Sequence, residues 1–72
     1  MPLVTIEVFE EELSDSQSQD LIRKVTEAII PFAGEKLRAN AWVLIEEIAS
    51  GSWGIGGQAS GLEDVRAIQS QK

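Results

Sequence analysis

The fold follows from the stretch Leu3-Val4-Thr5-Ile6-Glu7-Val8-Phe9, close to the start of the chain. Its β-branched residues predict a strand over residues 3–9. Successive side chains of a strand point to opposite faces, and here apolar residues occur on both of them. A strand with this pattern needs cover on two sides, so we expect it to lie in a sheet that is packed on both faces.

A helix is predicted directly after this strand. Ser14 and Gln17 have the spacing of a capping box, which marks a helix start. Pro31 is expected to end or kink the helix, and Gly34 is a suitable stop. The apolar residues between these points recur at helical intervals and predict one buried face, made of Leu21, Val25, Ala28, Ile29 and Phe32.

The second half of the chain predicts a strand, a tight hairpin and a short helix. Apolar and polar residues alternate from Ala39 to Glu46 or Glu47, which indicates a second strand. Glycines are concentrated between Gly51 and Gly57, as is typical of a hairpin. The polar tail contains one apolar helical stripe, formed by Leu62, Val65 and Ile68.

Strand, helix and strand in this order predict an α+β fold built on a β-α-β unit, with parallel strands, a right-handed crossover and a Gly-rich hairpin. We expect one domain over residues 1–72, with a core at 2–58 and a tail at 59–72. One helix covers only one face of a two-stranded sheet. The other face therefore requires a second chain, and a chain of 72 residues is too short to bury a large core by itself.

The composition excludes several classes of function. The chain has no Cys and no His, so thiolate and imidazole metal sites and His-assisted nucleophiles are absent, and no metal or other cofactor is expected. Twelve acidic residues against six basic ones argue against nucleic acid as a partner. No apolar run reaches the roughly 20 residues that span a bilayer, and no signal peptide is recognisable, so we expect a cytoplasmic protein without a membrane partner.

Pro2 is the first candidate for a catalytic residue. Removal of the initiator methionine before a proline would leave Pro2 as a free secondary amine at the start of a strand. An apolar environment would lower the pKa of this amine toward neutrality, where it can serve as a general base. The alternative is a purely structural role, because proline suits the first residue of a strand.

Three further side chains are candidates for binding. Trp53, in the glycine-rich segment, is expected to pack as a hydrophobic plug against a neighbouring subunit and could supply the apolar wall that Pro2 needs. Lys36 and Arg38, which precede the second strand, are the better placed cations for an anionic ligand. A solvated surface role is the alternative for both of these cations.

Taken together, these residues resemble the 4-oxalocrotonate tautomerase family. The resemblance covers residues 2–58 and rests on Pro2 opening its strand, on the helix that follows Leu13-Ser14-Asp15-Ser16-Gln17, and on the segment Ile45 to Gly57. It implies a β-α-β subunit that pairs into dimers and usually forms a hexamer. It also implies a cofactor-free tautomerase that converts an enol or dienol into its keto form, with Pro2 as the general base.

The chain departs from the family at the two arginines that hold substrate carboxylates. The first position falls at Glu12 or Leu13 and the second at Trp42. A charge-assisted hydrogen bond contributes roughly 1.5–3 kcal/mol, so a dicarboxylate such as 4-oxalocrotonate is not the expected substrate. Trp42 and Trp53 suggest a more apolar or aromatic one, and Arg38 is the candidate for a displaced cation.

Two other functions fit the same residues. The chain can be an inactive subunit of a tautomerase-like assembly, or a binder of small ligands that uses the tryptophans. Loss of Met1 from the native protein favours the enzyme, retention favours the inactive subunit, and fluorescence quenching without turnover favours the binder.

Overall fold

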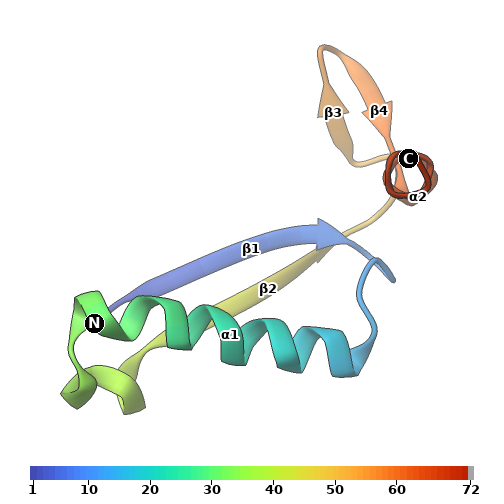
Figure 1. Ribbon diagram of the computed structural model, residues 1–72. Coiled ribbons are helices and arrows are strands. Elements are labelled where there is room, and N and C mark those ends of the chain that lie inside the picture. The colour runs from blue at the N-terminus through green and yellow to red at the C-terminus, as the bar shows by residue number, and fades with distance from the viewer. Residues whose placement is uncertain (72) are drawn as a thin grey trace.

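Two parallel strands and one long helix form the body of the protein. The computed structural model describes residues 1–71. Strand β1 (Leu3–Phe9) pairs with strand β2 (Trp42–Ile48) in parallel, with Leu3 opposite Trp42 and Phe9 opposite Ile48. Helix α1 (Asp15–Ala33) connects the two strands and contacts β2 (Figure 1). The predicted β-α-β unit with parallel strands is confirmed.

The amino end of α1 is a complete capping box. Ser14 Oγ accepts a hydrogen bond from the backbone N–H of Gln17 at 3.1 Å, and Gln17 Oε1 accepts one from the N–H of Ser14 at 2.9 Å. These two bonds satisfy donors that the first turn of a helix otherwise leaves without partners. The helix therefore begins where the sequence predicts.

Replacement of Ser14 by alanine removes one of these acceptors. We expect Ser14→Ala to lower the free energy of unfolding by about 1 kcal/mol, the usual contribution of an N-cap side chain. Chemical denaturation followed by circular dichroism measures this change. Ser16→Ala is the matched control, because Ser16 is exposed inside the first turn and caps nothing. Equal stability of Ser14→Ala and wild type would contradict the assignment.

Helix α1 stops at Gly34, as predicted, but its buried stripe differs from the prediction. Pro31 lies inside the helix, which continues to Ala33 because the N–H of Gly34 closes the last turn on the carbonyl of Ile30 at 2.8 Å. The stripe is rotated by one residue at this end: Ile30 is buried, whereas Phe32 is 92% exposed. The expected inward positions of Ala28 and Phe32 were therefore wrong, since the continued helix turns both of them to solvent.

A short 3-10 helix, η1 (Glu35–Asn40), replaces the predicted start of the second strand. Residues 39 and 40 belong to η1, so the strand begins at Trp42 rather than at Ala39. Gly34 has a φ of 100°, which lets the chain leave α1 sharply, and its carbonyl accepts the N–H of Leu37 at 3.0 Å. The chain reverses its direction through η1, and β2 can start only after this reversal is complete.

The glycine-rich segment forms the predicted hairpin, with strands β3 (Trp53–Ile55) and β4 (Gln58–Ser60) paired antiparallel. Gly56 and Gly57 make its two-residue turn with φ values of 57° and 83°. Such a turn needs positive φ at both positions, which glycine adopts without steric cost. Helix α2 (Leu62–Gln69) follows, as the apolar stripe of the tail predicts, although Ile68 is 67% exposed.

The single chain is elongated and has little core. Phe9 and Ile30 are its only buried large apolar side chains within residues 1–71. Its radius of gyration is 15.0 Å, whereas a compact chain of this length has about 11 Å. Figure 1 shows the reason: the hairpin and α2 project from one end of the sheet instead of folding over it.

One face of the sheet has no cover within the chain. Val4, Ile6, Val43 and Ile45 share one face and are half-buried. The opposite face carries Leu3 at 60%, Trp42 at 56% and Leu44 at 41% exposure. The bare apolar face expected from the two-sided pattern of β1 is therefore present in the single chain.

Candidate functional site

Pro2 lies at the amino end of β1 and is held by the sheet. Its carbonyl oxygen accepts a hydrogen bond from the N–H of Trp42 at 3.0 Å, so the residue is tied to the start of β2. The Pro2 side chain is half-buried, while its neighbours Leu3 and Trp42 are largely exposed. Pro2 therefore stands at the amino end of the sheet, with the backbone of Trp42 beside it.

Trp53 lies at the opposite end of the sheet from Pro2 of the same chain. Its ring packs on Phe9 with the ring centroids 4.9 Å apart and the planes inclined by 42°. Phe9 ends β1, and seven residues of strand advance about 20 Å at roughly 3.3 Å per residue. Trp53 thus packs as a hydrophobic plug on the carboxyl end of its own β1. Within one chain, Trp53 is therefore too far from Pro2 to provide its apolar environment.

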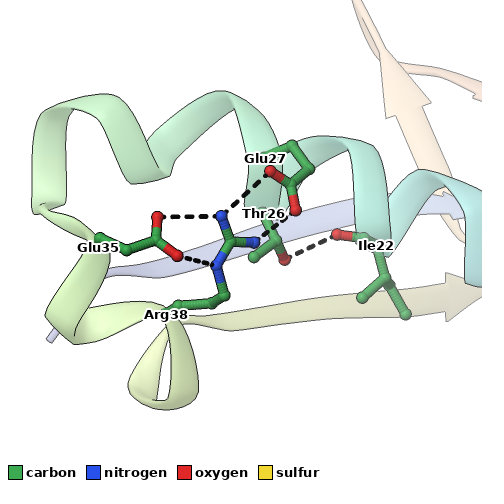
Figure 2. Close-up of polar contacts among 5 residues, drawn as sticks. All are labelled: Ile22, Thr26, Glu27, Glu35 and Arg38. Carbon is green, nitrogen blue, oxygen red and sulfur yellow. Dashed lines mark hydrogen bonds and ion pairs between the residues drawn. The ribbon is translucent and has the colours of Figure 1, made fainter.

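Arg38 lies in η1, where two carboxylates surround its guanidinium (Figure 2). It forms ion pairs with Glu27 of α1 and with Glu35 of η1, the latter at 2.7 Å. Hydrogen bonds from Arg38 hold the pKa values of the Glu27 and Glu35 carboxyls below their ordinary range. The same carboxylates, Glu35 first, raise the pKa of Arg38. The predicted displaced cation is thus already neutralised by its own chain.

This cluster gives a pH-dependent contribution to stability. A carboxyl whose pKa is lowered by folding stabilises the protein above its ordinary value of 4.5, and this stabilisation is lost as the pH falls through the folded value. We expect Arg38→Gln to lower the melting temperature slightly at pH 7, since exposed ion pairs contribute little. The difference from wild type should shrink below pH 4.5.

Thermal unfolding at pH 7 and pH 3 tests this prediction. Lys36→Gln is the matched control, because it removes one positive charge from the same 3-10 helix and Lys36 has no ion pair among residues 1–71. An equal deficit of Arg38→Gln at both pH values would rule out the ion pairs as its cause.

The turn between β1 and α1 contains Glu12, which with Leu13 was one of the two positions expected for the first missing arginine. Its carboxylate accepts the backbone N–H of Phe9 at 3.1 Å and so caps the end of β1. The preceding residue, Glu11, has a φ of 65°, a left-handed conformation that is uncommon for a residue with a side chain.

Sequence reasoning missed Arg66, which lies against this turn. From α2, Arg66 Nη2 donates to the backbone carbonyls of Glu11 and Glu12 at 3.1 and 3.0 Å. The position of an arginine within a short amphipathic helix gives no indication of a contact with a turn more than 50 residues earlier. No local sequence pattern predicts this contact of Arg66.

Residues 1–71 contain neither an acidic metal site nor a membrane-spanning helix. No group of three acidic side chains comes close enough to hold a metal ion in this part of the chain. None of the described helices is both long and apolar enough to cross a bilayer.

The chain resembles known proteins over most of its length. The model of the Tautomerase enzyme family matches residues 2–63. The chain belongs to the tautomerase family. This match begins at Pro2 and contains both strands of the sheet, the long helix and the hairpin.

Individual tautomerases support the assignment. The probable tautomerase K2 of Dickeya dadantii (strain 3937) is 34% identical over 59 residues, which cover 82% of this chain and 87% of that protein. The crystal structure of YwhB, a homologue of 4-oxalocrotonate tautomerase, is 32% identical with a TM-score of 0.71 and covers 88% of this chain and 97% of that one.

Two further structures extend the comparison. A 4-oxalocrotonate tautomerase isozyme from Methylibium petroleiphilum is 29% identical with a TM-score of 0.69, over 81% of this chain and 90% of that one. TomN, a 4-oxalocrotonate tautomerase homologue of the tomaymycin biosynthetic pathway, is 25% identical with a TM-score of 0.72 and covers 96% of this chain and 100% of that one. The tautomerase fold of the chain is thus found in several solved relatives.

Proposed function

We propose that this tautomerase converts an enol into its keto form without a cofactor, with Pro2 as the general base. The observation that carries the proposal is the placement of Pro2 at the first position before β1, where the sheet bond to Trp42 holds its backbone. Removal of Met1 exposes a secondary amine there. The base takes the enol hydroxyl proton, and the protonated amine delivers a proton to carbon, so that the net change is the shift of one proton.

The acting species is proposed to be an oligomer, a dimer or an assembly of dimers up to a hexamer. The bare face of the sheet supports this, because it exposes Leu3, Trp42 and Leu44 to solvent in the single chain. Contiguous exposed apolar surface of this kind marks an interaction site. A second copy on this face would also surround Pro2 with apolar groups, which lowers the pKa of an amine.

The proposed substrate carries an apolar or aromatic group. Trp42 is next to Pro2 and 56% exposed, so its indole can contact such a group. Arg38 is proposed only as a secondary contact, because Glu27 and Glu35 already bind it. A dicarboxylate would meet few uncommitted positive charges on this chain.

Intact mass and turnover measured on one sample test the proposed function. We expect a protein that lacks Met1 and that ketonises phenylenolpyruvate, followed by ultraviolet absorbance. A sample with free Pro2 and no turnover of any enol in a panel of simple enols would contradict the proposal. Quenching of tryptophan fluorescence by such a compound in that inactive sample would then indicate a ligand binder.

A further inference from the structure

Two glutamates lie next to each other on the bare face of the sheet. In the register of the parallel strands, Glu7 is directly opposite Glu46, and the next row toward the amino end is Thr5 with Leu44. Both glutamates are exposed, like the apolar residues of the same face. Neighbouring strands are about 4.8 Å apart, so two side chains that leave opposite positions on one face are close neighbours. The bare face therefore carries two adjacent like charges, here called the acidic row (Glu7 and Glu46).

The sheet supplies no positive charge to the acidic row. Strands β1 and β2 contain no Lys or Arg. None of the ion pairs among residues 1–71 involves Glu7 or Glu46. Helix α1 packs on the opposite face, so the sheet separates the row from the charged residues of that helix, which are Asp15, Asp20, Arg23, Lys24 and Glu27.

The elements at the two ends of the sheet do not compensate the row either. The 3-10 helix η1, with Glu35, Lys36 and Arg38, precedes the amino end of β2. At the carboxyl end, β3 and β4 contain no ionisable residue. The other charged residues at this end are Glu10, Glu11, Glu12, Glu47, Glu63, Asp64 and Arg66. Arg66 is the one cation of this list, and its guanidinium donates to the carbonyls of Glu11 and Glu12.

The acidic row belongs to a surface that a second molecule has to cover. No described segment lies over the bare face, because the hairpin and α2 project beyond its carboxyl end (Figure 1). Phe9 and Ile30 are the only buried large apolar side chains among residues 1–71, which is too little core for a stable single chain. A partner must therefore be present whenever the chain folds. A second copy of the same chain always meets this condition.

A symmetric contact through this face buries carboxylates without a cation. In a two-fold dimer the same patch of both copies meets. If the two sheets stack with their strands in the same direction, the two acidic rows face each other. If the strands run in opposite directions, each row faces the apolar end of the other sheet, at Leu3 and Trp42. Either arrangement leaves unpaired carboxylates in the contact, and burial of such a charge costs far more than burial of a neutral acid.

We propose that self-association through the bare face takes up protons at Glu7 and Glu46, so that the assembly tightens as the pH falls. A proton turns one carboxylate of the row into an acid, whose O–H can donate a hydrogen bond to the other carboxylate. Because the contact favours the neutral form, the assembly gains stability at low pH and loses it as the pH rises and the row becomes charged. The inference rests on the proposed function, whose oligomer it regulates.

The first test is the pH dependence of self-association. Sedimentation velocity over a range of concentrations gives the dissociation constant of the wild type at pH 7.5 and pH 5.5. Each proton taken up changes this constant by up to about 10-fold per pH unit, so we expect it to be at least about 10-fold lower at pH 5.5. If the wild type stays associated at every concentration, the urea concentration of half-dissociation replaces the constant and should rise at pH 5.5. Equal values at both pH values would overturn the inference.

The second test separates the acidic row from the net charge of the chain. Glutamine has nearly the shape of glutamate and no charge, so Glu7→Gln/Glu46→Gln should associate at pH 7.5 about as tightly as the wild type at pH 5.5. Its association should no longer depend on pH in this range. The matched control is Glu10→Gln/Glu47→Gln, which removes two exposed charges from the same end of the sheet, with Glu47 on the opposite face of β2. The control should keep the wild-type pH dependence, and circular dichroism reports whether both variants fold.

Three results of this comparison would overturn the inference. A pH dependence that persists in Glu7→Gln/Glu46→Gln, or an equal gain in the control, would assign the effect to the net charge of -6. Tightening by added Mg²⁺ or Ca²⁺ at pH 7.5, without a pH effect in EDTA, would assign the row to a metal ion. Failure of the proposed function gives other results: a wild type that is monomeric at both pH values, or an oligomer with free Pro2 that turns over no enol.

Discussion

The variant Pro2→Ala is expected to lose enol-to-keto conversion, with kcat reduced by roughly 10²- to 10⁴-fold, the usual contribution of a positioned general base. The ring of proline fixes φ and gives a secondary amine in one orientation, whereas alanine leaves a primary amine on a freer chain end. The sheet bond from Trp42 to the Pro2 carbonyl persists in the variant, because it involves only backbone atoms. The fold is therefore expected to survive.

The measurement is single-substrate kinetics on protein whose mass confirms loss of Met1. Pro31→Ala is the matched control, since Pro31 is the second of two prolines and lies exposed near the end of α1. It should keep wild-type activity and gain stability, because a proline inside a helix removes a backbone hydrogen bond. Wild-type turnover by Pro2→Ala would refute the assignment of the base.

The variant Trp42→Glu is expected to abolish self-association. Trp42 stands beside Leu3 on the bare face of the sheet, so in the proposed oligomer its side chain lies at the contact with a second copy, next to the substrate. An unpaired charge buried in such an interface costs about 3–5 kcal/mol, which weakens association by roughly 10²- to 10⁴-fold. Turnover should fall with it, since the proposed site needs two copies.

Sedimentation velocity at micromolar concentration measures the mass of the species in solution, and circular dichroism reports whether the variant still folds. Gln19→Glu is the control because it adds the same charge at an exposed position of α1. We expect the control to remain an oligomer. A wild-type mass for Trp42→Glu would refute the bare face as the contact surface. A monomeric wild type would refute the oligomer itself.

The elements that depend on neighbours in the chain were predictable. The capping box at Ser14 and the two glycines at the hairpin turn determine local geometry through bonds and φ angles within four residues. The strand at residues 3–9 followed from its composition. These interactions form wherever the chain is placed, so the sequence alone indicates them.

Predictions that required packing were less accurate. The helix was expected to bury Phe32, but the continuation past Pro31 exposes it and buries Ile30 instead. The strand was expected from Ala39, but residues 35–40 form η1. In both places the outcome depends on packing against the rest of the fold, which a local sequence pattern does not show.

For the candidate site too, some features follow from the sequence and others only from the tertiary structure. The sequence by itself determined that Pro2 comes directly before the first strand and that this strand is apolar on two faces. Only the tertiary structure decided that Arg38 is bound by Glu27 and that Arg66 lies against the turn at Glu11 and Glu12, 54 residues from the latter. The physical reason is that a charge acts through distance in space, and the separation along the chain does not reveal which groups the fold brings together.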